Sequence, residues 1–83
     1  MTNANATTII KLLAAIELAS DTDIAPDIAV DLLELAATEL SLSNSDERFC
    51  ISEAIDALLD SDEEFSNEEV EFYESFMDNF GLL

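Results

Sequence analysis

A chain of 83 residues with twenty acids and only two bases, Lys11 and Arg48, has a formal net charge of −18. That charge excludes direct binding to nucleic acid and to anionic membranes, because both repel a surface of carboxylates. Because 49% of the residues are hydrophobic, the sequence predicts a folded domain and not a disordered acidic tail.

The apolar spacing is helical along nearly the whole chain, and one Gly and one Pro leave few helix breakers. We therefore predict an all-α domain over residues 7–83, either a small four-helix bundle or an orthogonal array of two helical hairpins. Residues 1–6 are small or polar, and we expect them to form a flexible N-terminal tail. The first helix, predicted over residues 7–20, has apolar side chains on more than one face, which favours burial on all sides.

The second helix, predicted over residues 26–42, begins at Pro26, whose fixed φ suits a first turn, and Asp27 complements the helix dipole. Its predicted inward face consists of Ile28, Leu32, Leu35, Ala36 and Leu40. The third helix is predicted over residues 46–59. Its predicted apolar face consists of Phe49, Ile51, Ile55, Leu58 and Leu59.

The fourth helix, predicted as one continuous segment over residues 66–80, has signals at both ends. A capping box and the hydrophobic staple around it mark its start, formed by Ser66 with Glu69 and by Phe65 with Val70. At its end, Gly81 suits a left-handed C′ residue, and Leu82 can then fold back onto Met77. The end signals and the apolar pattern therefore predict the same helix.

Most of the side chains that enzymes use are missing from the sequence. It has no His, no Gly-rich loop and one Lys, so we expect no enzyme activity and no cofactor. Cys50 is the single cysteine, which excludes an intrachain disulfide and a structural zinc site of the Cys/His kind. Acyl carrier proteins are similarly small, acidic and four-helical. They need a Ser at the start of the second helix, where this chain has Pro26 and Asp27.

The twelve residues from 60 to 71 resemble the calcium loop of EF-hand proteins. Oxygen-bearing side chains stand at the six ligand positions, namely Asp60, Asp62, Glu64, Ser66, Glu68 and Glu71. The pattern departs from the family at the sharp turn, where the loop requires Gly and this chain has Phe65. The capping box would also start a helix in mid-loop. We therefore predict no metal site and no calcium binding in the range of cytosolic sensors.

Acidic residues follow one another at helical spacing along the last three predicted helices. Like charges at such spacing destabilise a helix by roughly 0.2–0.5 kcal/mol per pair, so their accumulation needs a reason. We interpret it as DNA mimicry, in which the protein binds the basic nucleic-acid-binding channel of a partner protein and inhibits it. Duplex DNA carries one charge per about 1.7 Å, so the net charge matches roughly 30 Å of duplex. Phage and mobile-element proteins that inhibit restriction or CRISPR systems resemble this chain in size and charge.

Thirteen of the twenty acids lie from Asp46 onward, and we place the mimic face on the last two predicted helices. The predicted partner-binding residues are Glu53, Asp56, Asp60, Asp62, Glu63, Glu64, Glu68, Glu71, Glu74 and Asp78.

Three other interpretations stay open on the sequence alone. An acidic solvated surface without a specific role and adaptation to high salt would each give a similar composition. The third is a helical adaptor that binds another protein through an apolar helix face, or a second copy of itself through the first helix. No apolar segment reaches the ~20 residues that span a membrane, and the N-terminus lacks the positive charge of a signal peptide. We therefore expect a cytoplasmic protein, in the host cell if a phage encodes it.

Overall fold

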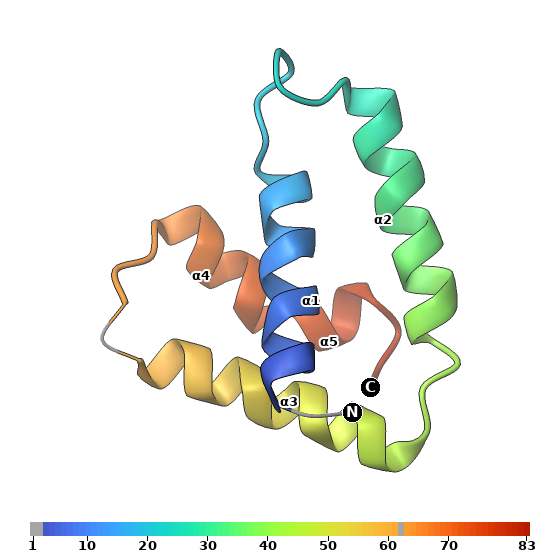
Figure 1. The fold of residues 1–83 in the computed structure, drawn as a ribbon, viewed down its shortest axis with the longest axis vertical. Helices are drawn as coiled ribbons and strands as arrows, with labels where there is room; N and C mark the ends of the chain where they lie inside the picture. Colours follow the sequence, from blue (N-terminus) through green and yellow to red (C-terminus); the bar gives the residue numbers. More distant parts are fainter. Residues whose placement is uncertain (1–2, 62) are drawn as a thin grey trace.

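The computed structural model describes residues 3–61 and 63–83, and within them it has helices and no strand. The elements are α1 (Asn3–Glu17), α2 (Pro26–Leu40), α3 (Ser45–Asp60), α4 (Asn67–Glu74) and α5 (Phe76–Asn79). Helix α1 is central and packs on α2, α3 and α4. Figure 1 shows α2 running back beside α1, α3 crossing one end of α1, and α4 with α5 returning behind it. The predicted small all-α bundle is confirmed.

Apolar side chains from all five helices form one core, and its largest fully buried side chains are Ile10, Ile51 and Phe76. Aromatic rings supply much of the part that α4 and α5 contribute. The ring of Phe72 stands edge-on to those of Phe76 and Phe80, with centroids 5.7 and 6.2 Å apart. Among the described residues, no charged or polar side chain is buried, so this core is held by apolar packing alone.

The N-terminal tail that we predicted over residues 1–6 is wrong for residues 3–6, because α1 already begins at Asn3. Ala6 is completely buried and belongs to the core. The thiol of Cys50 on α3 donates to Oδ1 of Asn3 over 3.4 Å, which holds the first turn in place. Residues 1 and 2 of the predicted tail lie outside the described residues.

The inward face that we predicted for α2 is wrong for three of its five residues. Ile28 is 53% exposed, Leu32 40% and Leu35 61%. The core instead receives two members of the predicted face, Leu40 and the half-buried Ala36, together with the half-buried side chains of Leu33 and Ala37. The reason is the position of α2 at the edge of the bundle beside α1 (Figure 1). Only one side of the helix can be covered there, so apolar side chains on its other side stay in the solvent.

Helix α3 buries Ile51, Ile55 and Leu58 as predicted, but Phe49 is 65% exposed and Leu59 37%. It begins at Ser45, one residue earlier than predicted, because Asn44 and Glu47 form a capping box. The Glu47 N–H donates to Asn44 Oδ1 over 2.8 Å, and the Asn44 N–H donates to Glu47 Oε1 over 3.1 Å. The spacing of Asn and Glu could have shown this start in the sequence.

The capping box that we predicted at the start of α4 is confirmed. The Glu69 N–H donates to Ser66 Oγ over 3.2 Å, and the Ser66 N–H donates to Glu69 Oε1 over 3.1 Å. The predicted continuous helix is wrong at Ser75, which separates α4 from α5. The Ser75 hydroxyl donates to the carbonyl oxygen of Glu71 over 2.8 Å, and a back-bond of this kind bends helices.

The chain after α5 folds back as predicted. Gly81 has a φ of 68°, the left-handed conformation that favours glycine. The N–H groups of Gly81 and Leu82 donate to the carbonyl oxygens of Asp78 and Met77 over 3.2 and 2.8 Å, which is a Schellman motif. It returns Leu82 to the core, where that side chain is buried.

Candidate acidic interface

Nearly all carboxylates of the described chain face the solvent. Nineteen of the twenty acids lie in described residues, and seventeen of these are exposed. The two half-buried ones, Glu47 and Glu69, are the capping-box partners at the starts of α3 and α4. The acids that do not cap a helix therefore form an outer surface of one sign.

Nine of the ten predicted partner-binding acids lie in described residues, and all nine are exposed. We call these nine the C-terminal acidic set: Glu53, Asp56 and Asp60 on α3, Glu63 and Glu64 on the connection, Glu68, Glu71 and Glu74 on α4, and Asp78 on α5. The tenth, Asp62, lies outside the described residues. In Figure 1, α3 begins near the end of α2 and crosses the bottom of the view, and α4 lies on the other side of α1 from α2.

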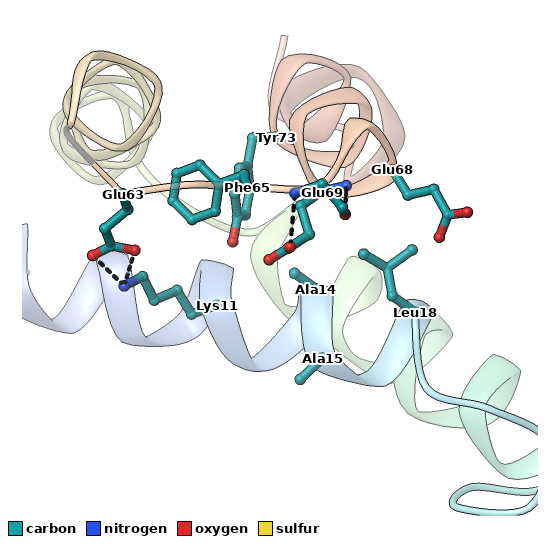
Figure 2. A pocket seen from close by; sticks show the side chains of 10 residues that line it. Lys11, Ala14, Ala15, Leu18, Glu63, Phe65, Glu68, Glu69 and Tyr73 are labelled. Carbon is teal, nitrogen blue, oxygen red and sulfur yellow. Dashed lines mark hydrogen bonds and ion pairs between the residues drawn. The ribbon is translucent and has the colours of Figure 1, made fainter.

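Two members of the set differ from the arrangement that we predicted. Asp78 follows the bend at Ser75, so it belongs to α5 and not to the single helix over residues 66–80 in which we predicted it. Glu63 is engaged in an ion pair, because Lys11 Nζ on α1 lies 3.0 Å from Oε1 and 3.1 Å from Oε2 of Glu63 (Figure 2). The other members of the set carry charge that no base of the described chain neutralises at salt-bridge distance.

The pair of Lys11 and Glu63 joins residues that are 52 positions apart, and no signal in the sequence could have predicted it. Both side chains are well exposed, so the pair contributes only ~0.2–1 kcal/mol to stability. Its main consequence is positional, since it ties the connection between α3 and α4 to α1.

The second base, Arg48, lies away from the C-terminal acidic set. Its Nε donates to the carbonyl oxygen of Ser43 and its Nη2 to that of Ser41, both over 2.9 Å. These hydrogen bonds close the connection between α2 and α3. The positive charge of Arg48 is therefore held at the opposite end of α3 from Asp60.

Next to the ion pair lies an open hollow of about 440 Å³ between α1 and the start of α4 (Figure 2). Apolar side chains such as Leu18 and Phe65 share its wall with charged ones such as Glu68, and the ring of Phe65 meets that of Tyr73 edge-on at 5.1 Å. Burial raises the pKa of Tyr73 above its ordinary value of 10.0, and the carboxylate of Glu69 adds to the rise. At neutral pH the Tyr73 hydroxyl is therefore a protonated donor.

The segment that resembles an EF-hand loop has the backbone of a helix start. Ser66 is extended, with φ −65° and ψ 161°, and caps α4. Among residues 3–61 and 63–83, no three acids, cysteines or histidines gather as they would around a metal ion. Across the same residues, no helix has the length and apolar character to cross a membrane. Comparisons with protein-family models, with curated proteins and with solved structures gave no match.

Proposed function

We propose that this protein is a DNA mimic, which inhibits a partner protein by occupying its basic nucleic-acid-binding channel. The observation that carries the proposal is the charge of the second half of the chain. From Phe49 to Leu83 the sequence has eleven acids and no base. Ten of these acids lie in described residues, and all except the capping residue Glu69 are exposed. A partner approaching this side meets carboxylates whose only cation at salt-bridge distance in the described chain is Lys11.

The size of the molecule supports the proposal. The backbone measures 36 × 31 × 19 Å along its principal axes. A net charge of −18 corresponds to roughly 30 Å of duplex at one charge per about 1.7 Å, so the charge per length is similar to that of DNA. The protein therefore offers the lysines and arginines of a DNA-binding channel about as many anionic groups as a short duplex does.

The internal energetics also support it. On α4, Glu68, Glu71 and Glu74 follow one another at three-residue spacing and are all exposed. Each such like-charge neighbour costs roughly 0.2–0.5 kcal/mol in the free protein. A basic channel would remove this repulsion on binding, so the cost in the free protein becomes affinity in the complex.

The partner class that we propose is a DNA-binding enzyme of a restriction or CRISPR system, met in the cytoplasm. The first test is capture of partners from the source cell on the immobilised protein, elution with a salt gradient, and identification by mass. The captured partner should then be displaced by duplex DNA and should lose affinity steeply between about 50 and 200 mM salt. An affinity that barely changes over this range would refute mimicry and favour a contact through apolar side chains.

The adaptor interpretation is supported by a different helix from the one that we considered in the sequence. Helix α1 packs on three other helices, and Leu12, 60% exposed, is its most exposed large apolar side chain. The monomer therefore covers most of the apolar surface that favoured a dimer through α1. Helix α2 leaves more large apolar side chains exposed than α1 does.

A further inference from the structure

Helix α2 presents four large apolar side chains to the solvent, and three of them share one face: Ile28, Leu32 and Leu35, which we call the α2 ridge. Their spacing of four and three residues places them on one face of the helix. All three are exposed, although the core nearby buries smaller side chains such as Ala6 and Ala54. Adjacent exposed apolar side chains of this kind mark interaction surfaces, whereas single ones need no explanation.

An acid precedes each residue of the ridge directly in the sequence. Asp27, Asp31 and Glu34 are all exposed, and we call them the α2 acid row. Successive residues of a helix are turned by about 100°, so the row lies along one flank of the ridge over its whole length. The surface of α2 therefore has two parallel stripes, one apolar and one negatively charged.

This surface is separate from the C-terminal acidic set. Helix α2 packs against α1 with its opposite face, which contains Leu33, Ala36 and Ala37. In Figure 1, α2 and α4 lie on opposite sides of α1. The surface of α2 is thus available for a second contact while the acidic set is occupied.

We propose that the α2 ridge and the α2 acid row together bind an amphipathic helix that carries Lys or Arg beside its apolar face. Three apolar side chains at this spacing are the pattern through which one helix docks on another. From Ile28 to Leu35 the ridge rises about 10.5 Å, which is two helical turns. The acid row selects the charge of the occupant, because cationic side chains on the matching flank would pair with it and acidic ones would be repelled.

A second copy of this chain fits the surface poorly. Each copy has a net charge of −18, so association brings two strongly negative molecules together. In an antiparallel pair of helices, equivalent flanks face each other. Two copies joined through their ridges in this way would therefore place one acid row against the other.

The test uses two fluorescent peptides of about 18 residues, long enough for a helix of ~27 Å. The first contains Leu, Ala and Lys, with Leu at helical spacing and Lys on one flank. The second has the same composition in an order without an apolar face. Binding to the full-length protein is measured by fluorescence anisotropy. We expect one saturating site for the first peptide and an affinity at least tenfold lower for the second.

Matched variants of the protein test whether the first peptide binds on α2. The double variant Ile28→Ser, Leu35→Ser should weaken binding of the first peptide at least tenfold. Conversion of the α2 acid row to the corresponding amides should weaken its binding by a similar factor at low salt. Phe49→Ser removes an equally exposed apolar side chain from α3 and should leave binding unchanged. All these side chains are exposed, so the fold is kept, which circular dichroism checks.

Three results would overturn the inference. Equal binding of the two peptides, or binding that the ridge variant leaves unchanged, would show that general charge attraction explains the contact. A dimer of the protein alone in sedimentation analysis, lost in the ridge variant, would assign the ridge to a second copy. This inference does not rest on the proposed mimicry, since the ridge variant keeps the C-terminal acidic set intact and should still be displaced from its channel by DNA.

Discussion

Converting Glu64, Glu68 and Glu71 together to Lys changes the net charge from −18 to −12, because each substitution removes one negative charge and adds one positive charge. The same change applied to the three acids of the α2 acid row also gives −12, on the other side of α1. The two variants therefore differ in where the charge is placed and not in how much remains. If the C-terminal acidic set enters the channel, the first variant loses inhibition and the second keeps it.

The salt dependence sets the size of the effect. On the scale of DNA binding, each charge contact contributes about 0.9 to the slope of log K against log salt. From about 50 to 200 mM salt, three contacts then account for ~1.6 log units, or ~40-fold in affinity. The unmodified protein should therefore lose at least ~40-fold more affinity over this range than the Glu64, Glu68, Glu71 variant. Reversal of the charge, as opposed to its removal, enlarges this difference.

The assay is titration of the captured partner at several salt concentrations, with its DNA-dependent activity as a second measurement. The three substituted side chains are exposed, and a Lys in the first turn of α4 costs only ~0.3–1 kcal/mol against the helix dipole. The helical signal in circular dichroism should therefore be unchanged. Inhibition that survives this variant but is lost in the acid-row variant would show that the mimic face lies on α2 and that we assigned it to the wrong helices.

Four further predictions concern stability and ion binding. Phe76→Ala should lower the free energy of unfolding by ~3–5 kcal/mol in urea titration, because that ring is fully buried, whereas Phe49→Ala should change it by less than ~0.5 kcal/mol. Ser66→Ala should cost ~0.5–2 kcal/mol in the same measurement, because it removes the cap of α4, and no loss would contradict the capping box. The absorbance of Tyr73, the single Tyr in a chain without Trp, should titrate with a pKa above 10.0 when folded and near ~10 in urea. Because the folded pKa is the higher one, the stability from this group is complete below pH ~10 and is lost as the pH rises through the folded pKa. Calorimetry with calcium should show no one-site isotherm at micromolar concentration, and such an isotherm abolished by Glu71→Gln would establish an EF-hand-like site.

Short-range signals in the sequence predicted the ends of the helices well. Pro26 starts α2, the box of Ser66 and Glu69 starts α4, and Gly81 ends α5 in the left-handed conformation. Each of these signals acts between residues that are at most a few positions apart, so the chain elsewhere does not alter it. The same reasoning would have found the box of Asn44 and Glu47. The exposure of nearly all acids was equally predictable, because an unpaired charge is costly to bury.

Other features depend on which elements meet in space. Helix α1 starts earlier than predicted because Ala6 is buried in the core. The ion pair of Lys11 with Glu63 forms only because the fold brings α1 close to Glu63. The bend at Ser75 separates two segments whose apolar pattern is continuous in the sequence.

The clearest division between sequence and tertiary structure is on α2. The sequence by itself determined that α2 is a helix, because its apolar residues recur with the helical period. It could not determine which side of the helix is buried, because periodicity is the same for a covered and an uncovered face. That choice belongs to the tertiary structure, in which α2 lies at the edge of the bundle beside α1. Leu33, Ala36 and Ala37 pack on the core, and the side chains of the α2 ridge stay in the solvent.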